Sequence, residues 1–153
     1  MSVNIAQRNE MITHLLNGTL TSLNQVISMN YKVDKPTIGA SSFQLQFGVL
    51  IGITGDVKGK LILSGQTDVF SIIGETMFGT TIENDMLTSF SGELGNMIAG
   101  GLATNIVNKG LTTDITYPTI LKGDTTISGY KKAIKLRAMI EQAGNMNIYL
   151  CLD

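Results

Sequence analysis

The residues best suited to chemistry in this chain are a glutamate and an asparagine three positions apart, Glu93 and Asn96. Ser89 stands four residues before Glu93, so a helix through this segment would bring all three onto one face. Pro118 follows further along the chain, after twenty-one intervening residues. A carboxylate can pair with a cation, and a side-chain amide can both donate a hydrogen bond to water and accept one. The segment therefore predicts a compact polar site on a rigid element.

Other groupings of catalytic or metal-binding residues are weaker. His14 is the only histidine and Cys151 the only cysteine, and no cluster of residues has the spacing of zinc ligands. Cys151 lies in the apolar run IYLCL, which favours a buried thiol over a reactive one. The segment GDVKGKL has Leu61 where a phosphate-binding loop has Ser or Thr, so we interpret it as a hairpin turn. We expect neither a metal nor a cofactor of the chain's own.

Composition and charge favour one folded domain over residues 1–153. The chain is 43% apolar and 15% charged with a net charge of -1, which argues against disorder. Without a dominant basic patch, nucleic acid and anionic membranes are poor partners. No apolar run reaches the roughly 20 residues that a membrane helix needs. The N-terminus also lacks the basic and apolar regions of a signal peptide. We therefore expect a cytoplasmic protein with no membrane insertion.

The spacing of apolar residues predicts an α+β fold, with long helices packed on a largely antiparallel sheet. Helices are expected over 4–28, over 68–78 with Thr67 as the cap, and from Asn84 as the cap to Lys109. A break is expected at Pro36 and over 39–42. The strands are expected over 43–54 and 57–63, joined as a hairpin, and then over 112–118, 125–129, 131–141 and 145–152.

The motif residues Ser89, Glu93 and Asn96 should be exposed on the third helix. On a helical wheel they lie roughly 115° from the middle of an apolar stripe that should face the core. The stripe consists of Met86, Phe90, Leu94, Met97 and Ile98.

Four glycines interrupt this helix: Gly92, Gly95, Gly100 and Gly101. Because glycine inside a helix costs about 1 kcal/mol relative to alanine, some other requirement should explain them. For Gly95 and Gly101 we predict tight packing against a neighbouring element. For Gly92 and Gly100, which lie beside the motif residues on the wheel, we predict close approach of a partner's backbone.

The spaced pattern Ser89-x3-Glu93-x2-Asn96-x21-Pro118, in the context ELGNMIAGGLATNI, resembles the signature of the CheC/CheX/FliY chemotaxis phosphatases. These proteins remove phosphate from the response regulator CheY. Gly123, which follows Pro118, is also similar to the family pattern. Many relatives have aspartate where this chain has Ser89, and the family pattern admits either residue.

Within that family, the length, the single motif and the order of elements are most similar to CheX. CheC-like members often carry a second copy of the motif in the N-terminal helix. Here that helix offers only Glu10 followed by Thr13, with no asparagine at the required position.

The resemblance implies a phosphatase that hydrolyses the aspartyl-phosphate of phosphorylated CheY. It implies that Asn96 orients the attacking water, that Glu93 pairs with the regulator's active-site lysine, and that Mg²⁺ belongs to the regulator. Ser89 would be an edge contact, and Pro118 a structural residue that shapes the segment beside the helix. The resemblance also implies a homodimer formed by strand pairing. The alternative is a non-enzymatic module that binds a response regulator in a chemotaxis or flagellar assembly.

Overall fold

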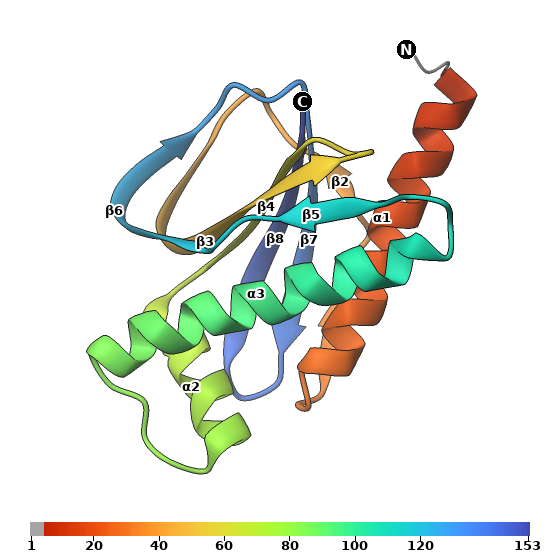
Figure 1. Cartoon of the computed structure of the whole chain (residues 1–153). Coiled ribbons are helices and arrows are strands. Elements are labelled where there is room, and N and C mark those ends of the chain that lie inside the picture. The colour runs from red at the N-terminus through yellow and green to blue at the C-terminus, as the bar shows by residue number, and fades with distance from the viewer. Residues whose placement is uncertain (1–4) are drawn as a thin grey trace.

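A computed structural model describes residues 5–153, which form three helices and eight strands (Figure 1). Residue 4, where the first helix was expected to begin, lies outside the described residues. The helices are α1 (Ile5–Val26), α2 (Thr67–Phe78) and α3 (Asp85–Val107). The strands are β1 (Tyr31–Val33), β2 (Thr37–Ile38), β3 (Phe43–Gly55), β4 (Gly59–Gly65), β5 (Thr113–Ile115), β6 (Thr119–Ile127), β7 (Lys132–Ile140) and β8 (Gly144–Leu152).

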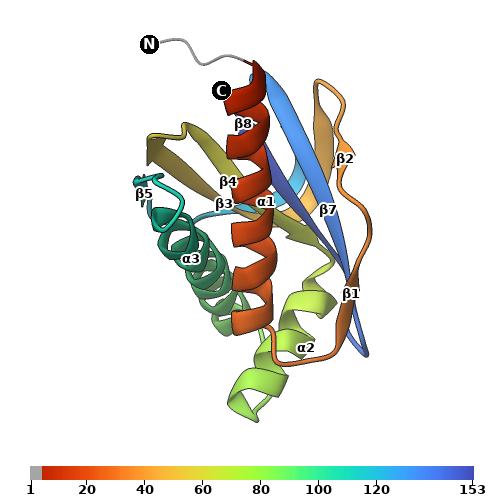
Figure 2. The same cartoon turned by 90° about the vertical axis from the view of Figure 1, so that its right-hand side faces the viewer.

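The strands form one sheet in the order β1-β7-β8-β4-β3-β5. β2 also pairs with β7, and β6 also pairs with β3. Every pairing is antiparallel. Helices α1 and α3 lie over one face of this sheet, and α2 lies near one end of it (Figures 1 and 2). The predicted α+β class is therefore confirmed. None of the described helices is long and apolar enough to cross a membrane.

The β3–β4 hairpin and the last two strands lie close to their predicted positions, whereas the region before β7 differs. The prediction of a strand over 125–129 was wrong at its start, because β6 begins at Thr119. The polar residues Lys122 and Asp124 interrupt the apolar pattern of β6, so its first half was not recognised as a strand. Between the pairs Leu45 with Thr125 and Phe47 with Lys122 the register shifts, and Gly123 in this irregularity has a φ of 80°. The short strands β1 and β2 were also missed, since each gains its hydrogen bonds from the distant β7.

The helix ends differ from the predictions in detail. Helix α2 begins at Thr67 itself, so Gln66 is the N-cap residue and the predicted cap at Thr67 was wrong. Asn84 is the N-cap residue of α3 as predicted, although its side chain forms no capping hydrogen bond. Helix α3 ends at Val107 and not at Lys109, because the amide of Lys109 donates to the carbonyl of Ile106 in a tighter turn.

The main core lies between the helices and the sheet. It includes fully buried side chains from all three helices, among them Leu15 of α1, Phe70 of α2 and Leu94 of α3. Phe90, Leu94 and Ile98 of the predicted apolar stripe are buried here. Met97 is only half-buried, and Met86 is 53% exposed, which corrects the assignment of Met86 to the core. It lies in the first turn of α3, where the helix extends beyond the sheet towards α2 (Figure 1).

Two of the α3 glycines allow the helix to pack closely on both neighbours. A β-carbon at Gly95 would lie 2.7 Å from Cγ1 of Val49 in β3. A β-carbon at Gly101 would collide with the Oγ of Ser22 in α1. The hydroxyl of Ser22 instead donates a hydrogen bond of 2.7 Å to the carbonyl of Ile98. The predicted packing role of Gly95 and Gly101 is confirmed.

We predict opposite effects on stability for alanine at two glycines of the same helix. Gly95→Ala should lower the free energy of unfolding by about 1–3 kcal/mol, because the added methyl overpacks the contact with Val49. Gly100→Ala should raise it by up to about 1 kcal/mol, because no atom lies within 4 Å of the added methyl and alanine favours the helix. Urea unfolding of both variants checks this. Equal midpoints would contradict the packing account.

Candidate functional site

Helix α3 presents the three motif residues on its outer side. Ser89 and Glu93 are exposed, and Asn96 is half-buried. Within residues 5–153, none of these three side chains forms a hydrogen bond or an ion pair with another residue. The carboxylate and the amide are therefore available to a second molecule.

The segment after β5 flanks this face. Thr116 fixes it to β3, since its amide donates to the carbonyl of Gly52 over 3.0 Å and its hydroxyl accepts from the amide of Gly52 over 2.8 Å. Pro118 then lies over Gly92, where a β-carbon would be 3.5 Å from Cγ of the proline. Pro118 thus lies beside the motif helix, as the sequence suggested. Gly92 is buried beneath this proline and not on the open face, where close approach of a partner's backbone was expected.

Gly100 lies in open space, since nothing is within 4 Å of a β-carbon placed there. The surface of α3 therefore carries no side chain one turn beyond Asn96.

Tyr117 was missed by the sequence interpretation, and it is 94% exposed beside Pro118. An exposed tyrosine is a common anchor in protein interfaces. In the sequence, the only indication of such a role is that Tyr117 immediately precedes Pro118, which belongs to the motif pattern.

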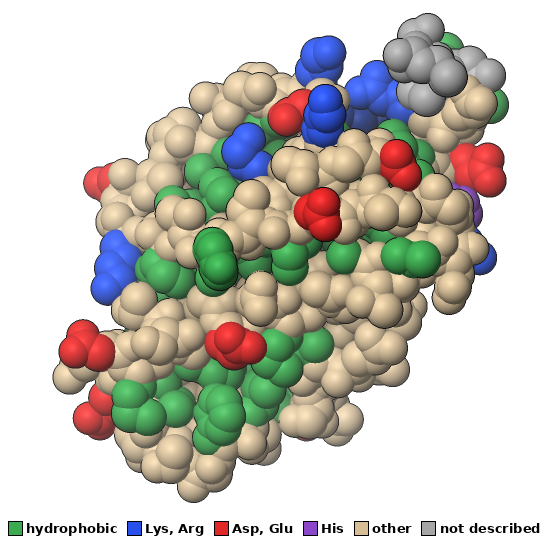
Figure 3. Space-filling model, in the orientation of Figure 1, with side chains coloured by type: hydrophobic (Ala, Val, Ile, Leu, Met, Phe, Trp, Pro, Cys, Tyr) green, Lys and Arg blue, Asp and Glu red, His purple; other side chains and the backbone are tan. Residues whose placement is uncertain are grey.

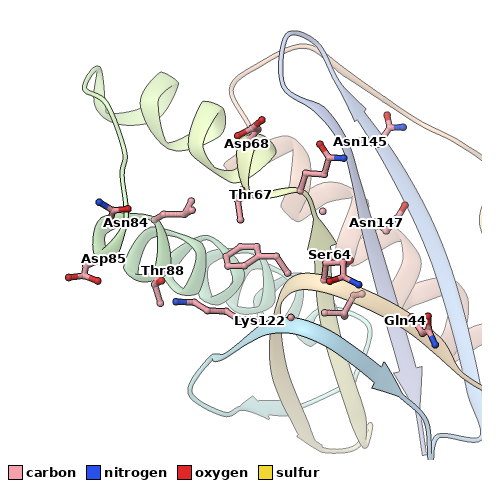
Figure 4. A pocket seen from close by; sticks show the side chains of 17 residues that line it. Gln44, Ser64, Thr67, Asp68, Asn84, Asp85, Thr88, Lys122, Asn145 and Asn147 are labelled. Carbon is pink, nitrogen blue, oxygen red and sulfur yellow. The ribbon is translucent and has the colours of Figure 1, made fainter.

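A large cavity lies beside the motif face. It has a volume of about 1010 Å³ and opens between α2, the start of α3 and the strands (Figure 4). Lys122 of β6 and Thr88 of α3 lie on one side of it, and Asp68 of α2 lies on another (Figure 4). Ser89, Glu93 and Asn96 do not line it. The polar groups of the motif thus lie on the outer side of α3, separate from this cavity.

The remaining reactive side chains lie elsewhere in the fold. His14 is on α1, where its Nε2 lies 3.5 Å from the Glu10 carboxylate. Cys151 is buried in β8, and burial raises the pKa of its thiol to about 11. A thiol with such a pKa stays protonated near neutral pH. Among residues 5–153, no group of three or more His, Cys, Asp or Glu side chains could hold a metal ion.

The chemistry available on α3 is therefore to place a water with an amide and to pair a carboxylate with a cation. Both groups lie on the outer side of α3. The fold and the site together define an α+β protein with accessible polar groups on one face of a closely packed helix.

Comparison with known proteins identifies the family. Residues 47–141 match the model of the family described as chemotaxis phosphatase CheX, and the chain belongs to this family. The chain is 28% identical over 144 residues to a Thermotoga maritima protein named CheY-P phosphatase CheX, with 91% of this chain and 93% of the relative covered. The resemblance to the CheC/CheX/FliY phosphatases, and to CheX in particular, is confirmed.

Solved structures of other CheX proteins share the fold. The chemotaxis protein CheX of Desulfovibrio desulfuricans matches with a TM-score of 0.79 at 19% identity, over 94% of this chain and 99% of that one. The CheX–CheY–BeF₃–Mg²⁺ complex of Borrelia burgdorferi matches with a TM-score of 0.74 at 18% identity, over 92% and 96% of the two chains.

Proposed function

We propose that this chain hydrolyses the aspartyl-phosphate of a CheY-type response regulator and that Asn96 places the attacking water. The chain is a chemotaxis phosphatase by family, and its Thermotoga relative is named for action on phosphorylated CheY. The observation that supports a role for Asn96 is its position. It is a half-buried amide on the outer side of α3, with no partner among the described residues.

An aspartyl-phosphate is an acyl phosphate and is already prone to hydrolysis. A catalyst gains most by holding a water in line with the bond that breaks. The Asn96 amide can accept a hydrogen bond from such a water through its oxygen and donate one through its nitrogen. It needs no shifted pKa for this task. The phosphoryl group, and the Mg²⁺ that offsets its charge, would come from the regulator. The Borrelia complex contains CheY together with Mg²⁺.

Glu93 sets the docking register in this proposal. Its exposed carboxylate lies one turn before Asn96 and has no ion-pair partner among the described residues. On docking it would pair with the active-site lysine of the regulator. An ion pair that becomes shielded from water at an interface can contribute substantially, whereas an exposed pair is worth under about 1 kcal/mol.

Ser89 and Gly100 would extend the contact along the same side of α3. Ser89 is exposed one turn before Glu93, and Gly100 leaves open space one turn after Asn96. Gly92 does not extend this surface, because it is buried beneath Pro118, whose Cγ would be in ordinary contact with an added β-carbon at 3.5 Å. A CheY-type regulator acts in the cytoplasm, so we place this chain there as well.

Two chains would pair through an exposed strand. Among the described strands, β6 pairs only with β3, so alternate residues along its nine-residue length present backbone hydrogen-bonding groups at a second, unpaired edge. Such an edge readily accepts another strand.

We predict that the chain is a dimer in solution through this edge. Light scattering should give twice the mass of 16.4 kDa, and the amides of β6 should exchange more slowly at high protein concentration. A mass of 16.4 kDa at every concentration would exclude the dimer.

We predict that Asn96→Ala removes most of the catalysis while binding is retained. The variant should lower the rate of regulator dephosphorylation at saturation by about 10²-fold, because the water loses its orientation. Its affinity for the BeF₃-loaded regulator should stay close to that of the wild type. Phosphate release from the phosphorylated regulator and calorimetry with the BeF₃ form measure the two quantities.

The matched control is Asn17→Ala, which removes an exposed asparagine from α1. It should behave as the wild type. Hydrolysis by Asn96→Ala at the wild-type rate would refute the role of Asn96. A wild-type chain that binds the regulator without accelerating its loss of phosphate would favour the alternative, a module that only binds.

We predict that Glu93→Lys weakens docking by at least tenfold, because a lysine then faces the lysine of the regulator. Calorimetry with the BeF₃-loaded regulator measures this. Glu141→Lys makes the same change of charge at an exposed position between β7 and β8 and should leave the affinity unchanged. Equal affinities for the two variants would rule out the proposed ion pair.

A further inference from the structure

An apolar groove adjoins the motif face at the start of α3. It has a volume of about 590 Å³, and its apolar lining comes from Phe78 at the end of α2, Ile82 in the connecting segment, and Met86 and Phe90 of α3. The rings of Phe78 and Phe90 meet edge to face, with centroids 5.6 Å apart. Phe78 is nevertheless 59% exposed and Met86 53% exposed. Two large apolar side chains in the lining of one groove are thus left in water, where a partner could cover them.

The groove and the motif share residues. Ser89 and Glu93 form part of the groove lining, and Asn96 follows Glu93 on the same side of the helix. Met86 precedes Asn96 by ten residues, which is about 15 Å along a helix axis. A standard interface buries about 800 Å² on each partner, equivalent to a disc with a radius of about 16 Å. A protein that engages Asn96 with a footprint of this size therefore also reaches the groove.

The charges around the groove have one sign. Residues 61–108, which include α2 and α3, contain no lysine or arginine. They contain five acidic residues: Asp68, Glu75, Glu83, Asp85 and Glu93. Figure 3 shows hydrophobic side chains gathered at the lower left, over the region of α2 and the first turns of α3, with acidic side chains next to them. Lys122 lines the larger cavity (Figure 4) and does not line the groove.

This charge pattern argues against a second copy of the chain as the occupant. A twofold interface on this surface would place the acidic residues of one copy opposite those of the other, and like charges at an interface repel. A partner with an apolar centre and lysine or arginine residues around it would complement both features of the groove.

We propose that the phosphorylated response regulator docks on this groove as well as on the motif face, and that it does so with an apolar contact surrounded by basic side chains. This inference rests on the proposed function. It assigns separate roles to the side chains of this surface: Asn96 acts on the water, Glu93 fixes the register, and Phe78 and Met86 supply affinity and selectivity for the regulator.

The test separates affinity from turnover in the full chain. Phe78→Ala and Met86→Ala should each raise the Kd for the BeF₃-loaded regulator, and the KM for the phosphorylated one, about five- to tenfold. The rate at saturation should stay within twofold of the wild type. Because both side chains are more than half exposed, the variants should fold, which circular dichroism checks. Val107→Ala removes a 55% exposed side chain at the far end of α3 and should change neither quantity.

A second arm tests the basic character of the partner. The Kd should rise with salt concentration, and the double variant Glu83→Gln with Asp85→Asn should show a weaker rise. Wild-type affinity in both alanine variants would overturn the proposal, and so would a Kd that does not depend on salt. If these variants instead convert a dimer into a monomer and leave the Kd unchanged, a second copy occupies the groove and the proposal also fails.

The results that would refute the proposed function differ from those that would refute the docking surface. Binding without hydrolysis by the wild-type chain would refute the proposed function, while the Kd series would still decide the docking surface. An absence of binding by the wild-type chain would refute both.

Discussion

The close packing of α3 against its two neighbours is the contact on which the rest of the structure depends. Gly95 lets the helix rest directly on Val49 of β3, and Gly101 lets α1 approach until Ser22 bonds to the backbone of α3. A side chain at either glycine would have to push these elements apart. The two contacts fix both the position of α3 and its rotation about its own axis, so they determine which residues face outwards.

A helix held in this way suits a protein that completes the site of another. The motif residues need no hydrogen bonds of their own to stay in place, because the backbone that carries them is fixed from behind. Their polar groups remain free to meet water, a cation or a phosphoryl group. The glycines therefore connect stability to function, and their cost in helix propensity is offset by the contacts they permit.

The sequence predicted the motif face well because the signal is local. Helical spacing alone placed Glu93 and Asn96 on one exposed side, and it identified Gly95 and Gly101 as packing positions. The errors arise where distant segments meet. Gly92 is buried because Pro118 folds back over it, and β6 is a long strand because β3 stabilises its irregular polar stretch. Neither fact follows from residue types near those positions. Met86 is exposed although it follows the apolar stripe, because α3 begins beyond the sheet.

The central claim is that this chain contributes the water-placing amide while the phosphate and the metal come from the regulator. The most direct measurement is the dephosphorylation rate of a regulator that is fully bound by the Asn96→Ala chain, compared with the regulator alone. The account predicts that the bound regulator loses phosphate at nearly its spontaneous rate. A rate near that of the wild-type complex would contradict the account.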